Sequence, residues 1–144
     1  MNMKVAKDRY QIAMRVIGRN FNQIIKDIVN TEIKNELYLT LQFIVRHGQT
    51  TNTELANQFE VGKSTITARL NRLDQLGLIE KQGNHKDKRT IYVAASSKGQ
   101  QLDKRIENKI LTVLSTIIKD VEEKELVNFL QTLEKFALLL EEHE

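Results

Sequence analysis

The sequence predicts a mainly α fold with a small β-hairpin, of the α+β class, because three features follow one another between residues 54 and 93. Two short stretches repeat apolar residues at helical spacing, and a turn at Glu60-Val61-Gly62 separates them. Gly77 then ends the second stretch, and two strand-like runs follow on either side of a charged tip. Two crossed helices followed by a hairpin predict a winged helix-turn-helix, and longer helical stretches flank it on both sides.

The apolar residues of the two short helices form one narrow face on each. The first face carries Leu55, Ala56 and Phe59, and the second carries Ile66, Leu70, Leu73 and Leu76. In the turn between them we expect Val61 to fill the corner and Gly62 to adopt the torsions of a short turn. Thr51-Asn52-Thr53-Glu54 has the pattern of a capping box, which predicts where the first of these helices begins.

The outward side of the second short helix carries small, polar and basic residues. These are Lys63, Ser64, Thr65, Thr67, Ala68, Arg69, Asn71 and Arg72. Such a surface fits a major groove of about 12 Å, where Ser, Thr and Asn read base edges and Lys and Arg reach phosphates. We therefore expect Ser64, Thr65, Thr67, Ala68 and Asn71 to contact bases. Lys63, Arg69 and Arg72 are expected to contact phosphate or support the helix.

The tip of the hairpin carries a second set of charged residues, Lys86, Asp87, Lys88 and Arg89. We expect Arg89 to enter a minor groove beside each half-site, where a narrow A/T-rich groove has the strongest negative potential. Asp87 lies two residues earlier, on the same side of an extended strand, and can orient the guanidinium. Lys86 and Lys88 are expected to neutralise phosphates. Two alternatives stay open: a helical hairpin buried in a core, and a winged helix that binds an acidic protein partner.

Long amphipathic helices are predicted on both sides of this motif. Apolar residues recur at helical spacing from the start of the chain to about residue 30, and a second stretch ends near Gly48. After the hairpin, Ser97-Lys98-Gly99-Gln100 opens a third long helix, and Asp120-Val121-Glu122-Glu123 opens a last one. The last helix alternates apolar residues by four and three, as a coiled coil does. A small hairpin motif cannot cover these stripes, so we expect a homodimer that reads a pseudo-palindrome.

We interpret residues 1–144 as one domain, in which 35–95 form the DNA-binding part and 1–34 and 96–144 form the dimerisation helices. The net charge is only +3, but basic residues predominate between 62 and 105 and acidic residues predominate after 119. This distribution favours phosphate at one part of the chain.

Composition and motifs argue against other classes of protein. The chain has no Cys, which excludes disulfides and thiolate metal sites. Its glycines form no phosphate-binding pattern and its His residues form no metal-ligand pair, so we predict no enzyme activity, no metal and no cofactor. With no long apolar run and no leader, no membrane partner is expected and a cytoplasmic location follows.

The order of these elements resembles the MarR family of bacterial transcription regulators. The resemblance rests on VGKSTITARLNRLDQLGLI and on Asp87-Lys88-Arg89 before a strand, and it is strongest from Leu55 to Gly99. The sequence departs from the family pattern at Gly83, where the wing often has Pro, and at Ala95-Ser96, which replaces a Leu-Thr pair.

The resemblance implies a repressor that a small aromatic or anionic effector releases from DNA. In such proteins the effector binds in a cleft between the dimerisation helices and the DNA-binding part. Five residues are candidates to line this cleft here: Tyr10, Met14, Tyr38, Phe43 and Arg46.

Overall fold

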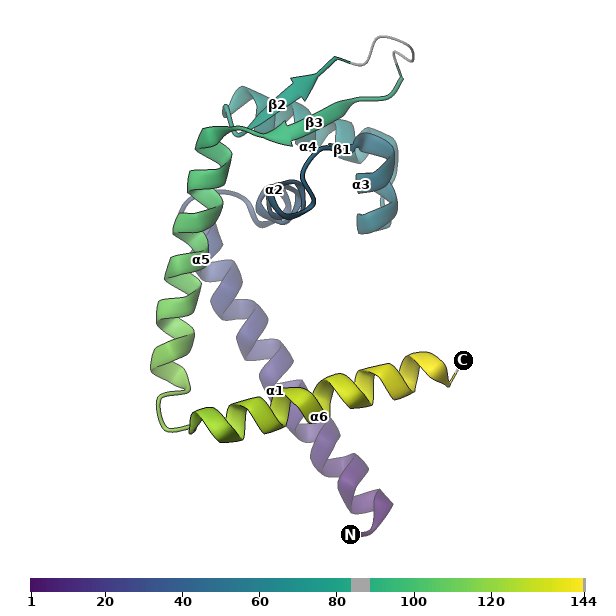
Figure 1. Cartoon of the computed structure of the whole chain (residues 1–144), viewed down its shortest axis with the longest axis vertical. Coiled ribbons are helices and arrows are strands. Elements are labelled where there is room, and N and C mark those ends of the chain that lie inside the picture. Colours follow the sequence, from purple (N-terminus) through teal and green to yellow (C-terminus); the bar gives the residue numbers. More distant parts are fainter. Residues whose placement is uncertain (84–88, 144) are drawn as a thin grey trace. The chain divides into compact units, whose positions relative to one another are not determined.

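The computed structural model describes residues 1–83 and 89–143, and the chain divides into two compact units, residues 1–110 and 111–144. The predicted fold class is confirmed, because helices dominate and the described strands form one small sheet (Figure 1). In chain order the elements are α1 (Met3–Asn30), α2 (Asn35–His47), β1 (Thr50–Thr51), α3 (Asn52–Phe59), α4 (Lys63–Gln75), β2 (Ile79–Gln82), β3 (Tyr92–Ala95), α5 (Ser97–Ile117) and α6 (Glu123–Glu142). Three of the predicted wing residues, Lys86, Asp87 and Lys88, lie outside the described residues.

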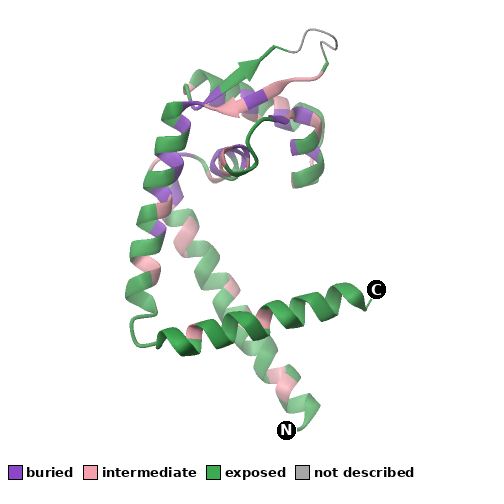
Figure 2. Ribbon diagram, viewed as in Figure 1, coloured by how far each residue is buried: buried purple, intermediate pink, exposed green. Residues whose placement is uncertain are grey.

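The core of the first unit lies around α2, which packs against α1, α4 and β3 (Figure 2). Leu41 and Ile44 of α2 have no exposed surface. The apolar faces predicted for α3 and α4 point into the same core, and Leu55, Ile66, Leu70 and Leu73 are fully buried there. Burial of side chains of this size stabilises the fold by roughly 1.5–3 kcal/mol each. Phe59 and Leu76, at the ends of the two faces, are only half-buried.

The sheet is antiparallel, with strand order β1-β3-β2. Ile79 pairs with Ala95 and Gln82 with Tyr92, so β2 and β3 form the predicted hairpin. The returning strand, β3, begins at Tyr92. Strand β1 was not anticipated, because two residues are too short for an alternating pattern, yet Thr50 pairs with Val93.

The turn between α3 and α4 differs from the expectation for Gly62. The left-handed residue is Glu60, with φ 54° and ψ 45°, and its N–H caps the end of α3. Gly62 has φ −71° and ψ 155°, an extended conformation open to any residue, and precedes α4 as its N-cap. The expectation that Gly62 provides the special torsions of the turn was therefore wrong.

Thr51 caps the first turn of α3, which is one half of the predicted capping box. The Thr51 hydroxyl accepts a hydrogen bond from the backbone N–H of Glu54 at 3.1 Å. The Glu54 carboxylate accepts from the hydroxyls of Thr50 at 3.1 Å and Thr51 at 3.4 Å.

The predicted capping boxes of the two C-terminal helices were placed at the wrong residues. Ser96, not Ser97, caps α5: its hydroxyl accepts from Gly99 N–H at 3.0 Å and donates to the Gly77 carbonyl at 2.6 Å. The capping box of α6 uses Glu122 and Glu125 rather than Asp120 and Glu123. In both places several neighbouring side chains can cap a helix, and the packing around the chain selects one.

Gly99 brings the first turn of α5 against the start of β2. A Cβ atom at Gly99 would lie 2.0 Å from the carbonyl oxygen of Leu78, a distance that no side chain can occupy. The Lys98 ammonium donates to the Leu76 carbonyl at 2.9 Å beside this contact. The end of α4, the start of β2 and the start of α5 are thus fixed to one another.

The α1–α2 connection is held to α5 by an ion cluster. The Glu32 carboxylate accepts from the Arg105 guanidinium at 2.9 Å and from the Lys109 ammonium at 3.1 Å. Burial raises the pKa of Glu32, but hydrogen bonds from Lys109 and Arg105 outweigh it, and the net pKa is lowered. This contribution to stability is present above the ordinary carboxyl pKa and is lost as the pH falls through the lowered value.

The long terminal helices keep most of their apolar surface exposed in the single chain. Only Val29 is buried in α1, while Tyr10, Ile17 and Phe21 are exposed by 41–48%. In the second unit, α6 has no buried residue, and Phe129 and Leu130 are exposed by 50% and 42%. The amphipathic helices predicted from the sequence are confirmed. Among the described residues, no helix has the length and apolar character needed to cross a membrane.

Candidate nucleic-acid interface

Helix α4 presents the predicted polar face outward because Ile66, Leu70 and Leu73 turn the opposite face into the core. Of the eight predicted residues, Thr67 and Arg69 are half-buried. The other six are exposed: Lys63, Ser64, Thr65, Ala68, Asn71 and Arg72. The first turn has no acidic residue and begins with a lysine, so its N–H groups and its charge both favour an anion.

One flank of α4 is tied to the hairpin. The Lys81 ammonium of β2 donates to the Asn71 side-chain oxygen at 2.7 Å. This bond fixes the side-chain oxygen of Asn71. It thereby orients the NH2 group of the same amide, which can still donate a hydrogen bond. On the other flank the Arg69 guanidinium lies over the Phe59 ring at 5.9 Å, and Arg72 donates to Gln75 at 3.4 Å.

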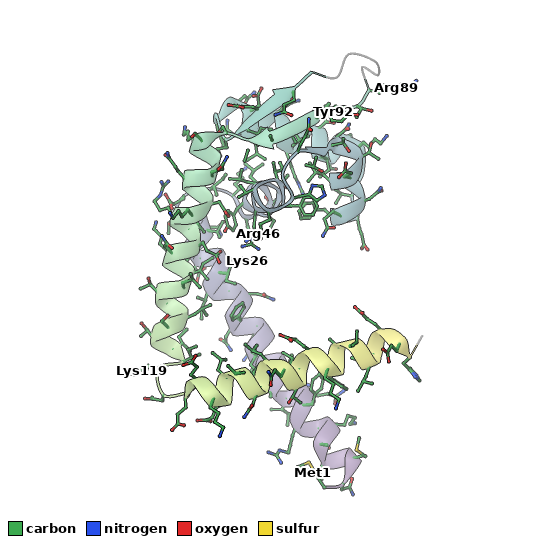
Figure 3. The ribbon with its side chains drawn as sticks, in the orientation of Figure 1. Met1, Lys26, Arg46, Arg89, Tyr92 and Lys119 are labelled. Atoms are coloured by element: carbon green, nitrogen blue, oxygen red, sulfur yellow. The ribbon has the colours of Figure 1, made fainter. Side chains whose placement is uncertain are left out.

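The returning side of the hairpin is fixed by Asn52. This residue is 3% exposed, and its side-chain amide accepts from Ile91 N–H at 3.1 Å and donates to the Arg89 carbonyl at 3.3 Å. The Asn52 backbone N–H also donates to the Ile91 carbonyl at 3.1 Å. Arg89 itself is exposed and lies where the described chain resumes after the tip (Figure 3).

Asn52 was overlooked in the sequence, where it appeared only as a middle residue of the Thr51–Glu54 box. An asparagine in the first turn of a helix gives no sign that its amide will be buried. Only the register of β1 with β3, which brings residue 52 beside residue 91, reveals its role.

Two of the five candidate cleft residues line one pocket. This pocket, of about 340 Å³, lies between α2 and α3. Phe43 stacks on His47 with ring centroids 5.1 Å apart and meets Phe59 edge to face at 6.1 Å. Arg46, labelled in Figure 3, lies at the same pocket and pairs with Glu107 of α5 at 3.3 Å. The full lining is Leu39, Gln42, Phe43, Arg46, His47, Gln58 and Phe59.

The other three candidates lie elsewhere in the single chain. Tyr38 is 1% exposed, and burial, together with the charge of nearby Asp103 on α5, raises the pKa of its hydroxyl. Asp103 is also buried, and its Oδ1 has no hydrogen-bond partner among the described residues. Tyr10 and Met14 lie in the N-terminal half of α1. No group of three His, Cys, Asp or Glu residues that could hold a metal occurs in the described part of the chain.

Comparison with known proteins places this arrangement in a family. The sequence model of the MarR family matches residues 33–91, from the end of the α1–α2 connection to the residue before β3. The HTH-type transcriptional regulator BilQ of Clostridioides difficile is 31% identical over 115 residues, which cover 77% of this chain and 77% of BilQ. The chain belongs to the MarR family. The uncharacterized HTH-type transcriptional regulator YwhA of Bacillus subtilis is 29% identical over 92 residues, 63% of this chain and 66% of YwhA.

Solved structures show the same fold over nearly the whole of this MarR-family chain. A MarR family protein from Bacillus stearothermophilus has a TM-score of 0.82 at 22% identity, covering 97% of this chain and 98% of that one. Staphylococcus aureus MarR, solved with salicylate and kanamycin, has a TM-score of 0.82 at 16% identity and 99% and 97% coverage. Streptococcus pneumoniae FabT, solved in complex with DNA, has a TM-score of 0.72 at 21% identity and 94% and 99% coverage. This chain is thus a transcriptional regulator of the MarR family with a winged-helix DNA-binding fold.

We predict that Asn52→Ala will destabilise this MarR-family chain by roughly 1–3 kcal/mol, because it leaves the Ile91 N–H and the Arg89 carbonyl without their partners. Urea unfolding followed by circular dichroism measures the free energy. Asn57→Ala, in the exposed part of the same helix, is the matched control and should cost far less. Equal losses for the two variants would show that the Asn52 contacts do not stabilise the hairpin.

Proposed function

We propose that this chain is a cytoplasmic, ligand-responsive repressor that binds a pseudo-palindromic operator as a homodimer. The observation that carries the proposal is the outward face of α4, where small, polar and basic side chains stand beside the hairpin without an acidic residue in the first turn. FabT, which shares the fold, was solved in complex with DNA. Residues 35–95 are the DNA-binding part in this proposal.

The contacts divide between bases and backbone. Ser64, Thr65, Thr67, Ala68 and Asn71 face base edges in the major groove, while Lys63, Arg69 and Arg72 contact phosphate or support the helix. Asn71 supports the assignment best, since Lys81 fixes its side-chain oxygen at 2.7 Å and so orients the amide. At the wing, Arg89 enters the adjacent minor groove, Asp87 orients it, and Lys86 and Lys88 neutralise phosphates.

Asn71→Ala is expected to remove discrimination at one base pair of each half-site, worth about 1–3 kcal/mol. Operator fragments are first selected from genomic DNA, and gel shifts then measure the affinity of each variant for every single-base substitution. Asn22→Ala on α1 should leave the preference unchanged. A uniform loss of affinity over all operator variants would assign Asn71 to the DNA backbone, and failure of the wild-type chain to bind any fragment would refute the proposed function.

The homodimer is supported by the apolar surface that each unit leaves uncovered. In the first unit, α1 exposes Tyr10, Ile17 and Phe21 on one stripe. In the second, α6 exposes Phe129 and Leu130 and has no buried residue along its 20 positions. Apolar stripes of this length are typical of helices that pack against a partner. A second copy of this chain is the occupant we propose, since an operator with two half-sites requires two recognition helices.

Changing Leu130 and Leu133 to Asp is expected to convert the dimer to a monomer, because it places unpaired charges in the apolar seam of α6. Sedimentation velocity measures the mass, and circular dichroism checks that the helices persist. Asn128→Asp together with Gln131→Asp adds the same charge at polar positions of the same helix, and this control should remain dimeric. If the variant with Asp at positions 130 and 133 remained dimeric, this face of α6 would not be the dimer contact.

An aromatic or anionic effector is supported by the pocket between α2 and α3. Phe43 and Phe59 offer aromatic rings, and Arg46 offers a guanidinium. Because Arg46 already pairs with Glu107 of α5 at 3.3 Å, a ligand carboxylate would compete with that ion pair. Tyr38, Tyr10 and Met14 do not line this pocket in the single chain, so of the five candidates the proposed effector site uses Phe43 and Arg46. S. aureus MarR was solved with salicylate, an aromatic carboxylate.

Salicylate is the probe for this effector site. We expect it to release the wild-type chain from its operator and to release Arg46→Gln only at a much higher concentration. Arg15→Gln, which removes the same charge from α1, should behave as the wild type does. If Arg46→Gln and Arg15→Gln bound salicylate with equal affinity in isothermal titration calorimetry, Arg46 would not belong to the effector site.

A further inference from the structure

A second pocket, of about 370 Å³, lies between the start of α2 and the flank of α4 that faces away from the hairpin. Three cations line it, Lys34, Arg69 and Arg72, against a single carboxylate from Glu36. Leu37 and Ala68 supply the rest of the lining. We propose that this pocket binds a phosphate of the DNA backbone, on the strand that borders the major groove opposite the wing. The inference rests on the proposed DNA-binding function and adds Lys34 to the interface.

The position of the pocket follows from the two flanks of α4. Thr67 and Asn71, four residues apart, form one row, and Asn71 is tied to Lys81 of the hairpin. Ala68 and Arg72 form the next row around the helix, and both line the pocket. Ala68 also belongs to the face expected to meet base edges. The pocket therefore opens directly beside the DNA-facing surface, on the side away from the hairpin.

The geometry of a DNA duplex indicates which group would lie at this pocket. A helix in the major groove has a sugar-phosphate strand on each side, because the groove is only about 12 Å wide. On one flank of α4, the hairpin would contact the neighbouring sugar-phosphate strand. The other strand must pass along the Ala68–Arg72 row, where the pocket lies. Contacts on both strands fix the orientation of a recognition helix better than contacts on one.

The pocket chemistry suits a phosphate. Among the described residues, no acidic side chain forms an ion pair with Lys34, Arg69 or Arg72. Arg69 is held in place by the Phe59 ring at 5.9 Å, so less side-chain freedom is lost when it binds an anion. Lys34 is exposed at the N-cap of α2 and can reach outward to phosphate. The small side chain of Ala68 allows a phosphate to approach the helix closely.

The salt dependence of operator binding tests the assignment. Each phosphate contact contributes about 0.9 to the slope of log K against log salt, so Lys34→Gln should lower the slope by about that amount without altering base preference. Lys26→Gln, which removes the same charge from the exposed surface of α1, is the control and should keep the wild-type slope (Figure 3). A slope for Lys34→Gln equal to that of the wild type would overturn the inference while leaving the proposed function intact.

Neutral methylphosphonates, introduced one at a time into a selected operator, locate the contact. One position in each half-site, on the strand opposite the wing, should weaken wild-type binding and have little further effect on Lys34→Gln. If the penalty at every position were the same for both proteins, Lys34 would act at no defined phosphate and the inference would fail. If wild-type protein bound no DNA at any salt concentration, the proposed function and this inference would fall together.

Free phosphate is the other source of the same chemistry. Operator binding is measured in sodium phosphate and in sodium chloride at equal ionic strength. Replacing chloride by phosphate should change the operator affinity of the wild type no more than that of Lys34→Gln. The reason is that the pocket is assigned to a phosphate held in place by the duplex. Specific inhibition by phosphate that disappears in Lys34→Gln would show a site for the free anion and overturn the assignment to DNA.

Discussion

The close contact between Gly99 and the Leu78 carbonyl sets the geometry on which the DNA-facing surface depends. A Cβ atom at position 99 would not fit between the first turn of α5 and the start of β2. Ser96 bridges the same junction, since one hydroxyl bonds both Gly77 and Gly99. The end of α4 and the base of the hairpin therefore meet at a fixed point. The spacing between α4 and the wing is set there, away from the residues that would touch DNA.

The apolar periodicity determined how much of the fold could be predicted. Ile66, Leu70 and Leu73 repeat at helical spacing, so their burial and the outward polar face of α4 followed from the sequence alone. The cap of α5 did not follow from the sequence, because Ser96 and Ser97 are equally able to cap a helix. Ser96 was selected by its reach to the Gly77 carbonyl, a contact between residues 19 positions apart. Such contacts leave no periodic signal.

The residues of the candidate site were likewise predictable from the sequence only in part. Residues exposed on one helix, such as Asn71, could be named from their position on that helix. Asn52 and Lys34 could not, because each gains its role from a partner element: β3 for Asn52 and α4 for Lys34. For the five proposed cleft residues, the sequence predicted the helix on which each lies but not the direction of its side chain. Phe43 and Arg46 meet at one pocket, whereas Tyr38 packs inward near Asp103, and helical spacing alone does not indicate which way each side chain turns.

The pairing of β1 with β3 also bears on the cooperativity of folding. The hairpin of β2 and β3 joins neighbouring segments, but Thr50 meets Val93 only after the whole of α3 and α4 has been enclosed between them. Closing this longer loop costs more chain entropy, so the pairing of β1 with β3 depends on the packing of the two helices between them. Asn52, which follows β1 directly, then fixes the backbone of Arg89 and Ile91. A chain in which α3 or α4 has unfolded therefore also loses the base of its wing, and it cannot retain half of a DNA-binding surface.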